Sequence, residues 1–448
     1  MTAVFLLFFT SSVVARSEQH SDMKLELVQL VWRHGDRSPT HTHKTDTIRE
    51  DDWKFGGGGW GQLSTIGMRQ HFEFGKQLRK RYVDTGFLSK TYNAKEIYVR
   101  STDYNRTIVS AMSNLMGMYS YHNRDSRVNV DFPEAEGWPH RLTPIPVHTV
   151  DHHTDFVGIA HARCNRKEWL GEMMRKRSRE FKALYKDPMV KKVFKKVSKK
   201  AGGKYDDKNV WEIYDVWLIE QVHFLERLKN ECDWYSIQMM EEINAINKKL
   251  INYDNGVFGR KIKMNGLDMG REIKKLRGGS LANDMNMHMH LKHKCLNRSN
   301  ESECRWISGL KYYAYSAHDT TVFALLAALG IQSKVVYKGG YPEYTAAAFV
   351  ELYTNKTDNK PYFKLLYRTS SEEDVIHTVT HYIPECGKRD YCELEVFQMY
   401  AEMVKPDKNM IEWCEVDPRR KRMDQRDERL KALIEQLIKE LNSYSRRE

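Results

Sequence analysis

The chain has 448 residues, of which 41% are hydrophobic and 11% are aromatic. This composition excludes an intrinsically disordered protein, and the length allows one large core or two packed units. The formal net charge of +12 is compatible with an anionic substrate or partner. The basic residues are dispersed, however, and no recognition motif accompanies them, so we expect no nucleic-acid partner.

The first residues are typical of a secretory signal peptide, which we predict to cover residues 1–15. A short apolar stretch runs from Ala3 to Phe9, and small residues lead up to Ala15, although the segment lacks a basic start. A buried first strand is the alternative, but a separate strand pattern begins at Met23. We therefore expect a secreted or luminal protein with no transmembrane segment.

Further along the chain, two stretches with the same pattern flank a different middle. Short β-type runs alternate with helical patterns over residues 23–131 and again over 311–417, which predicts an α/β core built on a doubly wound, mostly parallel sheet in three layers. Residues 132–310 are mainly helical in pattern and are predicted to form an inserted α-helical cap. Residues 418–448 place apolar side chains at helical spacing on a charged segment, which predicts an amphipathic helix that packs on the body, with a coiled coil or a membrane contact as alternatives.

Three strand-to-helix turns carry the residues that could perform chemistry. Each comes where a predicted strand ends and a helix pattern begins, in the segments "VWRHGDRSP", "IYVRSTDYNRT" and "KYYAYSAHDTT". Ligands of open α/β sheets bind beyond the carboxyl ends of the strands, so we expect the three turns to meet in one pocket. The candidate site residues in these turns are Arg33, His34, Arg37, Arg100, His318 and Asp319.

The chemistry of this set points to phosphate. Planar guanidinium groups bind phosphate through paired hydrogen bonds, and clustered arginines near apolar strands need an anion between them. A histidine beside them stays neutral and can attack phosphorus, which makes His34 the candidate nucleophile. Asp319 is the candidate general acid and His318 a phosphate ligand. No carboxylate cluster for Mg²⁺ accompanies the arginines, so we expect neither a metal ion nor a cofactor.

Taken together, "RHGDRSP", "IYVRSTDYNRT" and "SAHDTT" resemble the histidine acid phosphatases of the prostatic and lysosomal type, in branch 2 of the histidine phosphatase superfamily. The resemblance extends over most of the chain, through "GWGQLSTIGMRQHFEFGKQLRKRY" and "PIPVHTVD". It implies a phosphoglycerate mutase-like α/β domain with a helical cap, and metal-independent hydrolysis of phosphate monoesters in acid. It also implies an extracellular or lysosomal location and makes a homodimer plausible. The implied site has a phosphohistidine at His34, a proton donor at Asp319, and phosphate ligands at Arg33, Arg37, Arg100 and His318.

The seven cysteines suit an oxidising compartment. Spacing alone offers Cys295 with Cys304 and Cys386 with Cys392 as local loops, and it leaves three cysteines open. The resemblance implies a pair between Cys164 and Cys414 and supports Cys386 with Cys392. It leaves Cys232 unpaired, because alanine stands near position 347 where a partner is expected.

Four sequons for N-glycosylation occur in the sequence. We predict glycans at Asn297, Asn300 and Asn355. Asn105 lies within the segment "IYVRSTDYNRT" of the expected catalytic pocket, so we predict no glycan there.

Two other functions remain open. A phytase-like or polyphosphorylated-substrate phosphatase would want extra cations, which the lysines of residues 189–204 could supply, although Val190, Phe194 and Val197 fit a buried stripe with solvated lysines around it. A catalytically retired secreted binding protein is the second alternative, against which the presence of His34 and Asp319 argues.

Two further motifs are interpreted structurally. The histidines of "HMHLKH", at positions 288, 290 and 293, lack acidic or thiolate company, so we expect no metal site there. The glycines of residues 56–59 predict a flexible turn, because no Lys-Ser/Thr pair of a nucleotide-binding loop follows them.

Overall fold

The computed structural model describes residues 22–120, 123–298, 300–336 and 340–415. The predicted signal peptide and the predicted C-terminal helix lie outside these residues. Two compact units result, one from residues 22–162 and 188–405 and a smaller one from residues 163–187 and 406–415. No described helix is both long enough and apolar enough to cross a membrane.

The larger unit is built on one eight-stranded sheet with the order β10-β8-β7-β1-β6-β2-β3, and β9 pairs with β8 beside that path. The strands are β1 (Met23–Arg33), β2 (Ile97–Thr102), β3 (His148–Val150), β6 (Tyr312–Ala317), β7 (Ala347–Asn355), β8 (Pro361–Arg368), β9 (His377–Thr378) and β10 (Cys392–Glu393).

The α/β class predicted from the sequence is confirmed, and the sheet is mixed. Strands β1, β6, β2 and β3 run parallel. Strands β7, β8, β9 and β10 join by antiparallel pairing. Strands β7 and β8 pair antiparallel because a short turn joins them, and strands linked by so short a connection can only pair that way. The parallel half brings the carboxyl ends of β1, β6 and β2 to one edge.

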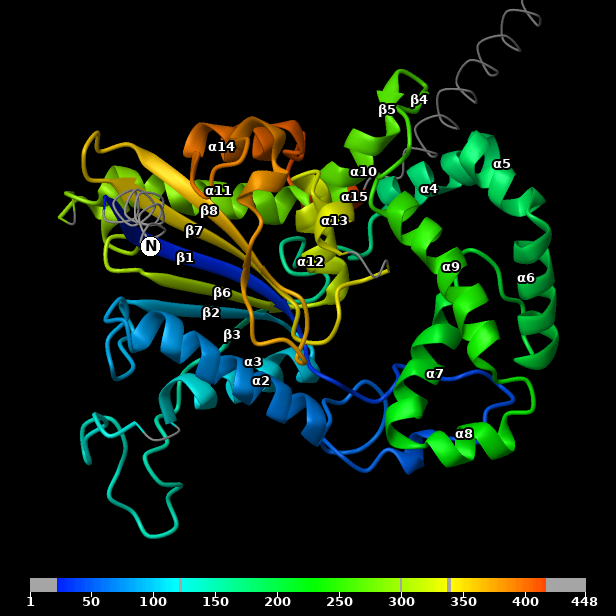
Figure 1. Cartoon of the computed structure of the whole chain (residues 1–448), viewed down its shortest axis with the longest axis horizontal. Coiled ribbons are helices and arrows are strands. Elements are labelled where there is room, and N and C mark those ends of the chain that lie inside the picture. The colour runs from blue at the N-terminus through cyan, green and yellow to red at the C-terminus, as the bar shows by residue number, and fades with distance from the viewer. Residues whose placement is uncertain (1–21, 121–122, 299, 337–339, 416–448) are drawn as a thin grey trace, which may run out of the picture. The chain divides into compact units, whose positions relative to one another are not determined.

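Helices cover both faces of this sheet, as Figure 1 shows. On β1, the side chains of Val28, Leu30 and Trp32 pack into the core beneath α2 (Thr65–Leu78) and α3 (Asn105–Leu115). Leu27 and Val31 alternate with them and face α11 (Gly279–Cys295), α12 (Asp319–Ala328) and α14 (Leu394–Met403). This period of two is what a strand buried on both faces requires.

Parts of the range 132–310, predicted as a cap, belong to these layers: β3 pairs with β2, and α11 packs on the sheet. The other elements of the range within the larger unit are α6 (Pro188–Lys200), α7 (Trp211–His223), α8 (Leu225–Glu231), α9 (Ile237–Asp254), the hairpin β4 (Lys263–Met264) and β5 (Leu267–Asp268), and α10 (Met269–Arg277). The short α13 (Gln332–Val335) follows α12.

The smaller unit contains α4 (Asn165–Arg177), α5 (Arg179–Lys186) and α15 (Met410–Glu415). A disulfide between Cys164 and Cys414 links its two chain segments. Next to it, the side-chain amide of Asn165 donates to the carbonyl of Glu415 at 2.8 Å. The disulfide therefore joins segments that are 250 residues apart in sequence.

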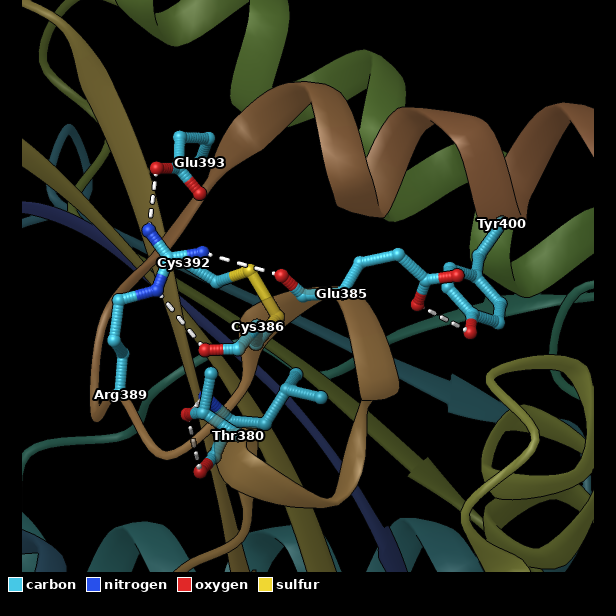
Figure 2. Close-up of a disulfide and its surroundings, with 8 residues drawn as sticks. Thr380, Glu385, Cys386, Arg389, Cys392, Glu393 and Tyr400 are labelled. Carbon is cyan, nitrogen blue, oxygen red and sulfur yellow. Dashed lines mark hydrogen bonds and ion pairs between the residues drawn. A yellow bond between two sulfur atoms is a disulfide. The ribbon is translucent and has the colours of Figure 1, made fainter.

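The other two expected disulfides are also present, Cys295–Cys304 and Cys386–Cys392, and Cys232 is a free thiol. Figure 2 shows how Arg389 closes the loop of the Cys386–Cys392 pair. Its guanidinium donates to the carbonyl of Cys386 at 3.0 Å and to the Glu393 carboxylate at 2.5 Å.

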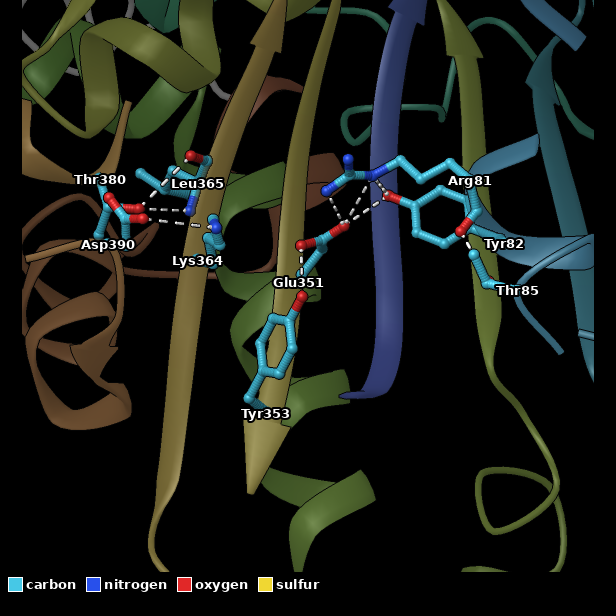
Figure 3. Close-up of polar contacts among 9 residues, drawn as sticks. All are labelled: Arg81, Tyr82, Thr85, Glu351, Tyr353, Lys364, Leu365, Thr380 and Asp390. Carbon is cyan, nitrogen blue, oxygen red and sulfur yellow. Dashed lines mark hydrogen bonds and ion pairs between the residues drawn. The ribbon is translucent and has the colours of Figure 1, made fainter. Parts of the chain in front are cut away.

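A buried carboxylate ties the π-helical turn Arg79–Val83, which follows α2, to the sheet (Figure 3). Glu351 of β7 is fully buried, and it accepts hydrogen bonds from the hydroxyls of Tyr82 at 2.6 Å and Tyr353 at 2.9 Å. The Arg81 guanidinium donates to the same carboxylate at 3.0 Å. A buried charge with this many donors is compensated, which explains how a glutamate stands in a central strand.

Candidate active site

His34 directly follows β1 at the edge where the parallel strands end. Its backbone N–H donates to the carbonyl of Ala317 at the end of β6. The N–H of Arg33 donates to Ala346 just before β7. The main chain at His34 is therefore fixed from both sides, and the side chain is 2% exposed.

Two glycines allow this turn to lie against the start of α2. A Cβ on Gly35 would be 2.5 Å from the carbonyl oxygen of Gly67, and a Cβ on Gly67 would be 2.3 Å from that of Asp36. Both distances are shorter than any ordinary contact, so neither position accepts a side chain without moving backbone. Residue 35 of the segment "RHGDRSP" is therefore glycine because of this close packing.

The hydrogen bond of the His34 ring decides its tautomer. Nδ1 lies 2.8 Å from the carbonyl oxygen of Gly35, and a carbonyl only accepts. The proton of the neutral ring therefore sits on Nδ1, which leaves the lone pair on Nε2. An imidazole held this way presents a nucleophilic nitrogen of defined direction.

The surroundings of His34 favour the neutral ring. Burial lowers its pKa well below the ordinary value, and the positive charges of Arg106, Arg33 and Arg37 lower it further. The neighbouring ring of His318, whose centroid is 5.7 Å away, is affected in the same way by burial and by Arg106. The neutral form is therefore favoured in both rings.

Arg33 connects the ends of β1, β6 and the turn before β7. Its guanidinium lies 3.3 Å from the Asp319 carboxylate and donates to the carbonyl of Pro342 at 2.8 Å. The group also stacks over the ring of Tyr344, 4.1 Å from the centroid. Asp319 is the first residue of α12, and its carboxylate accepts from the N–H of Thr320 at 2.6 Å. The helix N-terminus and Arg33 together hold this carboxyl group beside the pocket.

Helix α7 contacts the loop that follows β1 at two points. Near its middle, Asp215 accepts from Arg37 at 3.0 Å. At its end, Nε2 of His223 lies 2.7 Å from the buried carboxylate of Asp36, which also accepts from the hydroxyl of Ser64. The sequence alone does not indicate Asp215 or His223, because both lie in another helix about 180 residues further along the chain.

His318 occupies the position between β6 and α12 that the sequence predicts. Nε2 lies 3.0 Å from the hydroxyl of Thr102 at the end of β2. The ring also contacts those of Tyr104 and His161, with centroids 5.2 and 5.7 Å away. The three predicted turns therefore do meet, as the rule for parallel sheets requires.

Arg100 lies elsewhere. Its side chain leaves β2 on the same face of the sheet as that of Tyr98, two residues earlier. Tyr98 packs towards the α11 side of the sheet. Its guanidinium donates to the fully buried carboxylate of Asp155 at 2.5 Å. The charge of Arg100 is also not among those that shift the pKa of His34. The structure therefore does not bring Arg100 to the pocket as expected.

Arg106 is the pocket residue that the sequence reasoning missed. It lies in the first turn of α3 and stacks on the ring of Tyr104, 4.6 Å from the centroid. Burial lowers its pKa to about 10, and the charge of Arg37 contributes. A cation in the first turn of a helix opposes the helix dipole. That unfavourable placement is the sequence feature that could have identified Arg106 as functional.

The remaining predicted features lie outside this pocket. His288 is buried in α11 and bonds to Gln29 at 3.0 Å, which fits a structural role for that histidine. Residues 56–59 form the expected glycine turn, with positive φ at all four positions. Asn297 and Asn300 are exposed, and Asn355 is half-buried at the end of β7.

Comparison with known proteins agrees with this geometry. The model of the histidine phosphatase superfamily (branch 2) matches residues 24–368. Putative acid phosphatase 10 of Caenorhabditis elegans is 32% identical over 425 residues, which cover 92% of this chain and 100% of that protein. Prostatic acid phosphatase of Homo sapiens is 32% identical over 414 residues, which cover 90% of this chain and 89% of that protein. Lysosomal acid phosphatase of Xenopus laevis is 31% identical over 401 residues, which cover 89% of this chain and 80% of that protein.

Solved structures with the same fold include the apo form of the phytase from Hafnia alvei. The TM-score is 0.56 at 13% identity, and the match covers 87% of this chain and 99% of the phytase. At this identity the likeness shows the fold alone.

Proposed function

Because the chain belongs to branch 2 of the histidine phosphatase superfamily, we propose that this phosphatase hydrolyses phosphate monoesters in mildly acidic solution through a phosphohistidine at His34. Its relatives named acid phosphatases support the class of reaction. The observation that carries the covalent step is the His34 ring, whose Nδ1 proton is committed to Gly35 and whose Nε2 faces a cationic pocket. We further propose that the reaction needs no metal ion.

In the first half-reaction, Nε2 of His34 attacks phosphorus, and an N–P bond forms as the P–O bond to the leaving group breaks. Arg33, Arg37 and Arg106 neutralise the charge on the phosphoryl oxygens, and His318 adds a hydrogen bond. We assign Arg106 this role in place of Arg100, because its charge acts on His34 and that of Arg100 is used by Asp155. The leaving oxygen takes a proton from Asp319.

In the second half-reaction, the Asp319 carboxylate takes a proton from water as the water oxygen attacks phosphorus. The N–P bond breaks, inorganic phosphate leaves, and Asp319 is again protonated for the next cycle. Its place at the start of α12 and beside Arg33 supports both steps, because it keeps the carboxyl group next to the proposed phosphate position.

The test is release of 4-nitrophenol from 4-nitrophenyl phosphate between pH 4 and 7 with a chelator present. His34→Ala should lower kcat about 10⁴-fold, and quenching the reaction of ³²P-labelled substrate with alkali, in which phosphohistidine is stable, should leave label on the wild type alone. His140→Ala, at an exposed histidine, serves as the matched control with full activity. Retention of most activity by His34→Ala, or loss of wild-type activity with the chelator, would refute the proposal.

Of the alternatives, a phytase-like activity receives no support from α6. Val190, Val193 and Val197 are buried, as expected for a structural helix with its lysines around the outside. We also propose a secreted or lysosomal location, which the three disulfides support. Homodimer formation stays a prediction.

A further inference from the structure

A second cavity of about 320 Å³ lies in the larger unit, at the opposite end of α12 from Asp319. The elements around it are the segment 256–262, the start of α10, the turn after α12 and the end of α14 (Figure 1). Because α12 rises ~1.5 Å per residue, its nine-residue step from Asp319 to Ala328 separates this cavity from the catalytic pocket by more than ~10 Å.

The rim of this cavity is strongly cationic. Arg260, Lys261, Arg271 and Lys274 line it, together with the single carboxylate of Asp268. That carboxylate already has two partners, because it accepts a hydrogen bond from the backbone N–H of Arg271 and lies 3.2 Å from the ammonium group of Lys261. Lys274 is half-buried. Burial lowers its pKa, and the charge of Asp268, which is shared with Lys261 and Arg271, acts in the opposite direction. Four cations around one shared carboxylate leave an excess of positive charge at the cavity, which favours an added anion.

The floor of the same cavity is apolar. Phe258, Ile262, Ala328, Met403 and Val404 line it. Met403 is 38% exposed, and Met399, one turn earlier on α14, is 40% exposed, so an apolar strip continues from the cavity along that helix. Unbranched methionine side chains adapt readily to flexible alkyl groups.

Two backbone segments beside the cavity pack closely against each other. A Cβ on Gly256 would lie 2.4 Å from the carbonyl oxygen of Gly270, so the segment before β4 and the start of α10 are in direct backbone contact. Gly256 has a φ of +69°, which only glycine adopts readily. The cavity is therefore formed by the fold itself rather than by side chains alone.

We propose that this cavity binds a small amphipathic anion, with its charged group on Lys274 and Arg271 and its alkyl chain on the floor and along α14. Both parts are needed, since a bare inorganic anion leaves the apolar floor unused and a neutral lipid brings no counter-charge to the four cations of the rim. A single-chain anion can reach the site as a soluble monomer or from a membrane surface. We propose that the ligand binds as the soluble monomer. The site is separate from the proposed catalytic function.

The test is calorimetric titration of the full chain with ethane-, butane- and octanesulfonate below their micelle concentrations. A sulfonate is not a phosphate ester and is not hydrolysed. Affinity should rise with chain length by up to about fourfold per buried CH₂ group. Lys274→Met, which keeps the apolar stem of the side chain, should weaken octanesulfonate binding at least tenfold and leave kcat/KM for 4-nitrophenyl phosphate unchanged. The matched control is Lys195→Met on the exposed side of α6, which should bind as the wild type does.

A second variant tests the floor: Met403→Gln should flatten the chain-length dependence while binding of ethanesulfonate persists. Equal affinity for all three sulfonates, or wild-type binding by Lys274→Met, would overturn the proposal. Sedimentation with phosphatidylserine vesicles separates the two sources. Lys274-dependent binding to vesicles without any binding of the monomer would overturn the commitment to a soluble ligand.

Discussion

Arg37 and Asp215 form an ion pair inside the pocket, in which one guanidinium nitrogen lies 3.0 and 3.2 Å from the two carboxylate oxygens. The two side chains are 7% and 17% exposed. Burial alone would lower the pKa of Arg37, and the charge of Asp215 raises it instead. A phosphate that binds Arg37 must therefore share it with a carboxylate, which limits how tightly the pocket holds phosphate.

Asp215→Asn should tighten the binding of inorganic phosphate. The amide oxygen still accepts from Arg37, but the negative charge that repels the phosphate is gone, so the competitive inhibition constant should fall roughly threefold to tenfold. The measurement is phosphate inhibition of 4-nitrophenyl phosphate hydrolysis at pH 5. An unchanged or higher inhibition constant would show that Asp215 only positions Arg37.

Arg106→Ala and Arg100→Ala should separate catalysis from stability. Loss of Arg106 removes a charge from the pocket and should lower kcat/KM by about 10²–10³-fold. Loss of Arg100 leaves the buried Asp155 unpaired and should lower the free energy of unfolding by about 3 kcal/mol, with less than a tenfold effect on kcat/KM. The reverse pattern in the two variants would restore the role first predicted for Arg100.

Asp319→Asn should affect substrates according to their leaving groups. Phosphorylation of His34 by an alkyl phosphate needs the proton and should slow about 10²–10⁴-fold. With 4-nitrophenyl phosphate the first step needs no acid, so rapid-quench experiments should show a burst of one 4-nitrophenol per enzyme before slow turnover. Absence of the burst, with both substrates slowed alike in the first step, argues against the acid role.

His71→Gln should weaken the loss of stability in acid. Burial lowers the pKa of His71 to about 3, whereas the unfolded chain binds the proton near 6.5. Between these values only the unfolded state is protonated, so stability falls as pH drops below about 6.5. One such group lowers the free energy of unfolding by about 2 kcal/mol at pH 5.

Urea unfolding at pH 7 and pH 5 provides the measurement. Glutamine can still donate to the carbonyl of Arg33, which the ring of His71 contacts at 3.0 Å. The variant should lose about 2 kcal/mol less than the wild type between the two pH values. An identical loss in both proteins would mean that His71 titrates normally in the fold.

Much of the fold and most of the pocket follow from local sequence patterns. The alternation along β1 predicts a strand buried on both faces, and the turns after β1 and β6 place His34 and Asp319 at one edge of a parallel sheet. The spacing of Cys386 and Cys392 likewise predicts a local pair. The strand, the two turns and the cysteine pair each depend on a short local pattern, and the rule for parallel sheets then brings the two turns to one edge.

The partners of the charged groups depend on the tertiary structure alone. Arg100 and Arg106 stand six residues apart in one motif, and only the strand alternation and the start of α3 decide which of them points to His34. Asp155 and Asp215 come from distant segments, and neither has a local pattern that marks it as a partner. The sequence by itself determined which chemistry gathers at the strand ends, whereas packing decided which arginine is free to bind phosphate, because a buried charge goes to whatever counter-charge the fold brings within reach.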